Sequence, residues 1–442
     1  MRDGSESRRR RGGLAAAAVG GALCLLIAAC QGGSAPGAGA GSGSAATTSP
    51  SAAGMRLDIT PANGARHART GRGITVTASG GKITGVTVLH TSAGASGGPD
   101  ATASNSVPGA LNAAGTRWHS TWTLATSARY TVTAKGVSAN GQAVTETSSF
   151  RTFSPAQSFR TTIFEGYHKT YGVGMPIMLT FSQPITNKAA VERALQIRTS
   201  KPVTGAWYWD GDKTLDFRPR GYWPAHTKVS FTGHLDGVEG APGIYGTHTL
   251  TQSFSIGRSL IVVASTASHH MKLYRGGKLF RKWPISTGKP GDNTPNGTYL
   301  TIEKGNPVLM KGPGYRIKVP WSVRFTWSGD YLHDAFWSVG QQGFTNVSHG
   351  CVNMAPADAE MYYKMELPGD PVTITGSPRA GQWDNGWTQW FLSWQRYLTG
   401  SALHKAVQAG PDGSTFVSPS TLPAADPPAP IHAPPPGNWA AA

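Results

Sequence analysis

Cysteine is almost absent from this chain, and the few that occur are unevenly placed. Of 442 residues only three are cysteine, and Cys24 and Cys30 belong to an apolar run near the N-terminus. The rest of the chain therefore holds one thiol, Cys351, and can form no disulfide within itself. Its surroundings, Ser348-His349-Gly350-Cys351-Val352-Asn353, set an imidazole, a flexible glycine and an amide around the sulfur. This favours a thiol kept for chemistry over the alternative, a small buried apolar side chain.

Acidic residues are also scarce. The chain has 23 Asp and Glu against 40 Lys and Arg, a formal net charge of +17, and only 14% of its residues are charged. An excess of positive charge suits nucleic acid, anionic lipid or an acidic cell wall as partner. The basic residues are scattered and form no nucleic-acid-binding motif, so we expect no nucleic-acid partner. Since the N-terminus indicates export, we expect an acidic polymer of the cell envelope, with an ordinary solvated surface as the alternative.

Clusters of metal-binding residues are missing. The chain contains 13 histidines, but neither His-Glu-x-x-His nor Cys-x-x-Cys occurs. The adjacent pair His269-His270 would point to opposite faces of a strand and so makes a poor pair of ligands. We therefore expect neither a metal nor another cofactor.

The N-terminal apolar run is too short to cross a membrane as a helix. It extends from Leu14 to Ala29 behind the basic stretch Arg8–Arg11, which is typical of a signal peptide. Its end, Leu26-Ile27-Ala28-Ala29-Cys30, resembles a bacterial lipobox. The resemblance implies that Cys30 carries acyl chains, which anchor the mature protein to the outer face of the cell membrane. An ordinary cleaved signal with an incidental cysteine is the alternative.

Abundant glycine (57) and proline (31) favour β-structure and loops over helical bundles, so we expect a mainly β protein. Short segments in which apolar and polar residues alternate predict β-strands. These segments contain no cluster of ionisable residues, so we interpret them as two spacer modules. The predicted segments are a signal peptide (1–29), a lipidated cysteine with a flexible linker (30–54), two immunoglobulin-like β-sandwiches (55–153 and 154–257), a β-rich domain (258–376), a Trp-rich helical subdomain (377–418) and a disordered Pro/Ala-rich tail (419–442).

Local patterns add detail to this division. Asn140-Gly141 and Gly276-Gly277 each predict a hairpin turn. Residues 188–195 predict the one short helix of the second module. Tryptophan and tyrosine recur at three- or four-residue steps from Trp383 to Tyr397, which predicts an amphipathic helix whose aromatic stripe packs on the preceding domain, or in the alternative binds sugar.

A thiol nucleophile needs a base within hydrogen-bond reach. His333, in Tyr331-Leu332-His333-Asp334, is our candidate base for Cys351, and His349 a residue that orients it or shuttles the proton; the reverse assignment stays open. Acyl transfer also needs backbone donors for the developing oxyanion. Gly350 permits a tight turn in which its own N–H and that of Cys351 point inward.

Residues from about Ser259 to Gly376 resemble the L,D-transpeptidase (YkuD) catalytic domain. The resemblance is carried by Ser286-Thr287-Gly288, Thr294-Pro295-Asn296-Gly297-Thr298, His333 and the motif around Cys351. The whole chain is similar to the actinobacterial lipoprotein form, with two immunoglobulin-like domains ahead of the catalytic domain. The resemblance implies that Cys351 is the nucleophile and His333 its base, and that the substrate contacts are made by Tyr315, Ser328, Gly329, Trp337, Ser348 and Asn353.

Two positions depart from the family pattern. Asp334 stands where serine is common; the exchange is tolerated if this position acts through its backbone carbonyl, but its carboxylate could also raise the pKa of His333. Gly314-Tyr315-Arg316 resembles the active-site lid of the family, and the lid segment between Gly305 and Gly314 is short. This leaves open the specificity for the peptide that donates the acyl group.

The resemblance implies a reaction on peptidoglycan stem peptides. Cys351 attacks the diaminopimelate carbonyl of a tetrapeptide, releases D-alanine and passes the acyl group to a neighbouring amine, forming a third-to-third cross-link. The same site could act as an L,D-carboxypeptidase or attach a protein to the wall. A non-catalytic wall-binding lipoprotein is the alternative of another class. Carbapenems are the implied inhibitors, through acylation of Cys351.

Overall fold

The computed structural model describes residues 54–92, 106–312 and 314–422. The predicted signal peptide, the lipid anchor on Cys30, nearly all of the linker and most of the C-terminal tail lie outside these residues. Within the part of the chain that the structure describes, no helix is long and apolar enough to cross a membrane.

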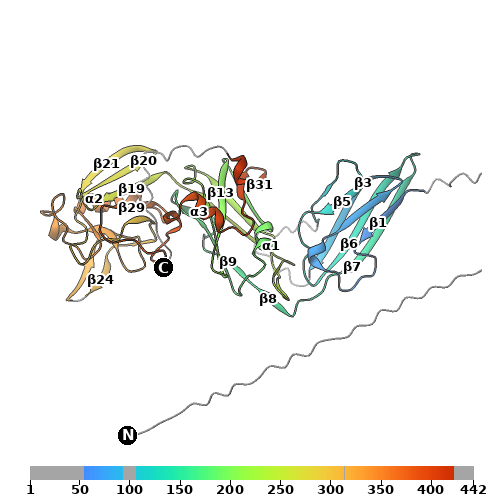
Figure 1. Ribbon diagram of the computed structural model, residues 1–442, viewed down its shortest axis with the longest axis horizontal. Helices are drawn as coiled ribbons and strands as arrows, with labels where there is room; N and C mark the ends of the chain where they lie inside the picture. The colour runs from blue at the N-terminus through green and yellow to red at the C-terminus, as the bar shows by residue number, and fades with distance from the viewer. Residues whose placement is uncertain (1–53, 93–105, 313, 423–442) are drawn as a thin grey trace, which may run out of the picture. The chain divides into compact units, whose positions relative to one another are not determined.

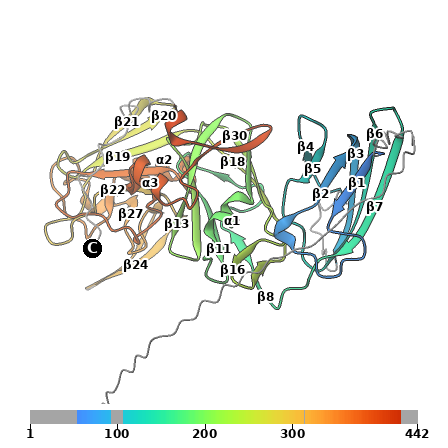
Figure 2. The same ribbon diagram turned by 45° about the vertical axis from the view of Figure 1, so that its right-hand side comes forward.

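The first module is a sandwich of two antiparallel sheets. One sheet contains, in order, β1 (Arg56–Thr60), β2 (Thr75–Ser79), β5 (Arg117–Ser120) and β4 (Gly109–Leu111). The other contains β3 (Gly81–Ser92), β6 (Ala128–Ser138) and β7 (Ala143–Arg151), and the short helix η1 (Thr70–Arg72) lies between β1 and β2 in the chain. Figure 2 shows both sheets at the N-terminal, blue end of the described chain. The predicted hairpin at Asn140-Gly141 is confirmed, because these residues join β6 to β7.

The second module is built from three sheets. The first is β10 (Thr170–Tyr171), β18 (Leu250–Ile256), β15 (Lys228–Gly233) and β12 (Leu195–Thr199). The largest is β31 (Gly413–Val417), β30 (Ala406–Gly410), β13 (Val203–Asp210), β14 (Thr214–Pro219), β11 (Ile177–Phe181) and β9 (Thr161–Ile163). The third is β16 (Glu239–Ala241), β17 (Ile244–Gly246) and β8 (Gln157–Phe159). The predicted short helix is confirmed as α1 (Lys188–Arg193).

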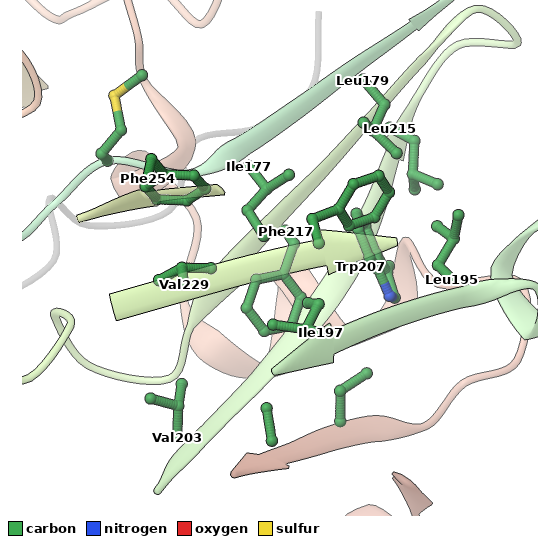
Figure 3. Packing of buried hydrophobic residues seen from close by; sticks show 14 of the residues in the cluster. Ile177, Leu179, Leu195, Ile197, Val203, Trp207, Leu215, Phe217, Val229 and Phe254 are labelled. Atoms are coloured by element: carbon green, nitrogen blue, oxygen red, sulfur yellow. The ribbon is translucent and has the colours of Figure 1, made fainter. Parts of the chain in front are cut away.

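The core of this module depends on aromatic residues that face each other across strands. Phe217 of β14 pairs with Ile177 on one side and with Trp207 on the other. The rings of Trp207 and Phe217 lie 5.2 Å apart, and all three side chains are fully buried. Figure 3 shows them with further aliphatic side chains of the same cluster. Burial of such large side chains supplies most of the stabilisation of a module without disulfides.

The C-terminal segment differs from its predicted form. The prediction of one continuous helix from Trp383 to Tyr397 is wrong. The structure has η3 (Gln389–Phe391) and α3 (Trp394–Thr399) there, and η4 (Pro419–Thr421) follows later in the chain. The indole N–H of Trp383 donates to Asp210, and that of Trp390 donates to the carbonyl oxygen of Gly174. Gly386, at φ +133°, has a backbone conformation outside the helical region. Separate anchoring points for successive tryptophans thus replace one continuous stripe.

Residues after this segment belong to the second module rather than to a helical subdomain of their own. β30 pairs antiparallel with β13, and Figure 2 shows β30, in red, beside the green strands of that module. The buried guanidinium of Arg218 lies 4.5 Å from the ring centre of Trp390 and 4.3 Å from that of Tyr397. The expected subdomain at 377–418 is therefore a strap whose end completes a sheet of the second module.

The β-rich domain contains two sheets, a hairpin and one longer helix. The larger sheet is β21 (Lys278–Pro284), β20 (His270–Arg275), β19 (Leu260–Ser265), β29 (Pro371–Thr375) and β22 (Gly297–Leu300), four of which Figure 1 labels next to one another. The smaller is β23 (Glu303–Gly305), β26 (Ser322–Arg324), β27 (Tyr331–Asp334) and β28 (Val352–Met354). The other elements are the hairpin β24 (Val308–Gly312) and β25 (Tyr315–Val319), η2 (Phe336–Ser338) and α2 (Pro356–Met365).

The second predicted hairpin is confirmed, because Gly276-Gly277 joins β20 to β21. Residues 286–288, after β21, contribute two isolated bridges, Ser286 to Asn353 and Gly288 to Ser348. These bridges hold the loop after β21 against the segment that contains Cys351.

Candidate active site

The parallel strands β27 and β28 hold the residues around Cys351. Their register pairs Leu332 with Val352 and His333 with Asn353. Leu332 and Val352 lie in the hydrophobic core, and side chains alternate between faces along a strand, so His333 and Asn353 face the other way. Cys351 lies two residues before Asn353 and thus on the same side as His333. The register therefore sets Cys351 and His333 on one side of the sheet, in diagonal positions on adjacent chain segments.

The Cys351 thiol is half-buried. Its Sγ lies 3.9 Å from the carbonyl oxygen of Gly329. Burial, followed by the nearby carboxylate of Asp330, raises the pKa of the thiol to about 12. At neutral pH the sulfur is therefore protonated, and a reaction at this site needs a base to remove the proton as the new bond forms.

His333 is buried, and its ring is fixed by its own backbone. Nδ1 lies 2.7 Å from the carbonyl oxygen of Asp334. A carbonyl only accepts, so Nδ1 carries the proton and Nε2 keeps its lone pair. Burial lowers the pKa of His333 to about 4. The possibility that the Asp334 carboxylate raises this pKa is therefore wrong: that side chain alternates to the other face of β27, and the residue acts on His333 through its carbonyl.

Ser348 and Thr294 shape the turn that carries the thiol. The hydroxyl of Ser348 donates to the carbonyl oxygen of Cys351 and accepts from the N–H of Gly350. The hydroxyl of Thr294 donates to the carbonyl oxygen of Gly350 and accepts from the N–H of Gly288. The N–H of Gly350 is thus used inside the turn, and the expectation that it points into the site is wrong. Ser348 serves the turn instead of lying free for a substrate.

The lid and His349 lie against each other. Tyr315, at the start of β25, stacks on the His349 ring with 5.2 Å between ring centres. Both side chains are exposed, and Nζ of Lys289 donates to Nε2 of His349 at 3.0 Å. The short lid is a regular hairpin in which Gly312 pairs with Tyr315.

Trp337 and Asn353 border His333 in different ways. Trp337 is 45% exposed and stacks on the His333 ring at 5.9 Å between ring centres. Asn353 is buried, and its amide donates to the hydroxyl of Ser338 at 2.9 Å. Trp337 thus offers an open apolar surface, whereas the Asn353 amide ties β28 to η2.

Ser328 and Gly329 form the rim beside the thiol. Ser328 is exposed, and Gly329 has φ +104°, which a residue with a side chain rarely adopts. The C-terminal strap reaches this rim, because Asn385 hydrogen-bonds Ser328.

Sequence reasoning missed two charged residues at the site. Asp330 is buried and accepts a hydrogen bond from the Ser328 hydroxyl. Lys289 donates a hydrogen bond to His349. Asp330 directly follows Ser328-Gly329 in the chain. Its position next to these two predicted substrate contacts was the indication that the sequence offered. Among the described residues, no group of three or more His, Cys, Asp or Glu could hold a metal ion.

Comparisons with known proteins agree with this geometry. A family model described as "L,D-transpeptidase catalytic domain" matches residues 259–374, and one described as "Bacterial Ig domain" matches residues 65–239. L,D-transpeptidase 2 of Mycobacterium tuberculosis (strain CDC 1551 / Oshkosh) is 31% identical over 335 residues, which cover 72% of this chain and 79% of the relative. The chain belongs to the L,D-transpeptidase family.

Other relatives cover less of the chain. L,D-transpeptidase 1 of M. tuberculosis (strain ATCC 25618 / H37Rv) is 37% identical and covers 46% of this chain and 80% of the relative. A solved structure of the L,D-transpeptidase LdtMt1 in complex with imipenem is 34% identical, covers 50% of this chain and all of that one, and has a TM-score of 0.43. This L,D-transpeptidase is a mainly β enzyme with immunoglobulin-like domains ahead of its catalytic domain.

Proposed function

We propose that this transpeptidase cross-links peptidoglycan stem peptides, with Cys351 as nucleophile and His333 as general base. The observation that carries the proposal is the parallel pairing of β27 with β28, which sets both side chains on one face. His333 is held in the tautomer that a base requires, because its Nδ1 is committed to the carbonyl of Asp334.

The first half-reaction forms a thioester. As Cys351 Sγ bonds to the diaminopimelate carbonyl of a tetrapeptide stem, its proton passes to Nε2 of His333. The imidazolium then gives this proton to the leaving nitrogen of D-alanine as the C–N bond breaks. Because burial keeps His333 a weak base and Cys351 a weak acid, proton transfer and S–C bond formation occur together.

The second half-reaction regenerates the thiol. A side-chain amine of a neighbouring stem attacks the thioester, the new C–N bond forms and the C–S bond breaks. The proton lost by the amine returns to the sulfur through His333. One amide is exchanged for another, so neither ATP nor a metal enters the balance.

The remaining site residues have proposed roles in binding. Tyr315, Ser328, Gly329 and Trp337 surround the thiol with an aromatic and partly exposed rim suited to an extended peptide. With the N–H of Gly350 used in its turn, the N–H of Cys351 is the proposed oxyanion donor.

Product analysis tests the proposal. Full-length protein in detergent is incubated with purified disaccharide-tetrapeptides, and the products are identified by mass spectrometry. A dimer that has lost one D-alanine supports cross-linking. A tripeptide alone would instead indicate the L,D-carboxypeptidase, and unchanged substrate together with a thiol that reacts with no carbapenem would indicate a non-catalytic wall-binding protein.

Location at the membrane is a separate proposal. The lipobox-like end of the N-terminal run supports acylation of Cys30, which would hold the enzyme on the outer face of the cell membrane facing the wall. Cys30→Ala should move the protein from the membrane fraction to the medium or wall. Fractionation identical to that of the unmodified protein would refute the anchor.

A further inference from the structure

Asp330 is a buried carboxylate beside the thiol that the proposed reaction does not use. It directly precedes β27 and is 6% exposed. Its Oδ2 accepts hydrogen bonds from the hydroxyls of Thr326, at 2.8 Å, and Ser328, at 3.2 Å. Its backbone N–H also donates to the Thr326 hydroxyl. Two hydroxyl donors on one oxygen favour the ionised carboxylate against the cost of its burial.

The other carboxylate oxygen lies against the turn that carries Cys351. Gly350 has φ +130°, and a Cβ added there would lie 2.2 Å from Oδ1 of Asp330. The carboxylate thus occupies the space that a side chain at position 350 would need. This places its charge one residue away from the sulfur, in a buried setting where two negative charges repel strongly.

We propose that Asp330 is a positioning residue that keeps Cys351 in the protonated thiol form until a substrate is bound. The carboxylate opposes a free thiolate, so the proton leaves the sulfur only as the sulfur bonds to the substrate carbonyl. This inference rests on the proposed function, because Asp330 affects catalysis only if Cys351 is the nucleophile. The direction of the thiol pKa, raised by burial and by Asp330, agrees with it.

Such control has a use in an exported enzyme with one thiol in its folded part. Oxidation and alkylation attack the thiolate, so a thiol that stays protonated resists both. The sulfur then remains available for acyl transfer in an oxidising environment, where His333 removes its proton only during the reaction.

Other charged and titratable groups face the Asp330–Cys351 pair from the elements packed around it. Burial raises the pKa of Asp330, although the hydroxyls of Thr326 and Ser328 and the charges of Arg379 and Arg324 act to lower it. The remaining groups are Tyr299, Tyr315, Tyr331, Asp292, His333, and His349 with Lys289. The Asp330 carboxylate is the one that lies against Gly350, so Asp330 is the residue to change.

The test measures the reactivity of the Cys351 thiol in full-length protein. The rate of alkylation by iodoacetamide is followed by intact mass from pH 6 to 10 for the unmodified protein, Asp330→Asn and Asp334→Asn. Asp334 is the matched control, because its carboxylate lies on the same strand but on the other face. Cys24 and Cys30 are replaced by alanine in all three proteins so that one thiol reacts.

We expect Asp330→Asn to lower the pKa of the thiol by about one unit. That shift gives about tenfold more thiolate below the pKa, offset by about threefold lower nucleophilicity, so the alkylation rate should rise about threefold. Oxidation by hydrogen peroxide should accelerate in parallel. Asp334→Asn should leave both rates unchanged.

Two results would overturn the inference: an alkylation rate that is the same in Asp330→Asn as in the unmodified protein throughout this pH range, or an equal rise in rate in Asp334→Asn. If Asp330→Asn loses its cooperative thermal transition, the alkylation rate of Asp330→Ser is measured instead and interpreted in the same way. The outcome is separate from the proposed function. A shifted thiol pKa in a protein that forms no cross-links would leave Asp330 its role while refuting Cys351 as the transpeptidase nucleophile.

Discussion

Asn385 and Ser328 hold each other through two hydrogen bonds, although 56 residues of sequence separate them. The N–H of Ser328 donates to Oδ1 of Asn385 at 2.8 Å, and the amide of Asn385 donates to the Ser328 hydroxyl at 2.9 Å. Asn385 is buried whereas Ser328 is exposed, so these bonds are partly shielded from water. The strap thus fixes the rim of the active site, next to the carbonyl that contacts the Cys351 sulfur.

Asn385→Ala should therefore slow acylation of the enzyme. Loss of this part-buried pair removes the Asn385 partner of the Ser328 N–H and hydroxyl and releases the loop before β27. We expect the rate of carbapenem acylation to fall about tenfold, measured by stopped-flow absorbance. Asp384→Ala, at the exposed neighbouring position, is the control and should react normally. Equal rates for all three proteins would mean that the strap does not support the rim.

Cys351→Ala should abolish acyl-enzyme formation and cross-linking. The change removes the proposed nucleophile but no disulfide, so the melting temperature should stay within about two degrees of that of the unmodified protein. Intact-mass spectrometry and muropeptide analysis measure the two activities. Cross-links formed by this variant would rule out Cys351 as the nucleophile.

Replacing each histidine tests the assignment of the base. His333→Ala should lower the rate of cross-linking by a hundredfold or more, the usual scale of general-base help. His349→Ala should cost about tenfold, because His349 is exposed and lies against Tyr315 and Lys289. A larger loss for His349→Ala than for His333→Ala would reverse the assignment.

The pH dependence of folding should reveal the buried imidazole. The pKa of His333 is lowered from 6.5 to about 4, so between these values the unfolded chain binds a proton that the native protein does not. Stability from this residue is therefore present above pH 6.5 and lost as the pH falls toward 4. In His333→Gln the melting temperature should fall less between pH 7 and 5 than in the unmodified protein. Parallel curves for the two proteins would show that His333 does not stay neutral in the fold.

Tyr315→Ala should separate entry of an inhibitor from the chemistry of the thiol. Without the ring that stacks on His349, the lid loses its contact beside the site, and carbapenem acylation should slow by about three- to tenfold. Reaction with iodoacetamide should not change, because this reagent is small. Leu309→Ala, an exposed change on the other strand of the lid, is the control for loss of an apolar side chain. Slower alkylation in Tyr315→Ala would mean that the tyrosine acts on the sulfur itself.

Local sequence patterns predicted those features that short-range chemistry determines. Asn140-Gly141 and Gly276-Gly277 produce tight turns because Gly141, Gly276 and Gly277 adopt positive φ, and both hairpins are present. The pairing of Cys351 with His333 could be predicted because a thiol nucleophile requires a base, whatever the fold. The resemblance to a known family then supplied the catalytic domain.

Features that depend on distant contacts could not be predicted in this way. Trp383 to Tyr397 have helical spacing, but Trp383 is anchored to Asp210 and Trp390 to Gly174, and the segment bends to reach both. The direction of the Gly350 N–H depends on a single hydroxyl, that of Ser348. Asp330 can lie against Gly350 because Gly350 has no side chain and has a φ of +130°. Sequence spacing does not encode this contact.

The return of β30 to β13 makes the catalytic domain an insertion in the chain of another module. Residues 258–376 leave the second module after β18, and the strap brings the chain back to complete its largest sheet. A single cut in the backbone near Gly257 would therefore leave both fragments joined through the pairing of β30 with β13 in one six-stranded sheet. Equally, a chain shortened after residue 376 would leave the β13 edge of the second module unpaired, so this module depends on residues that follow the catalytic domain.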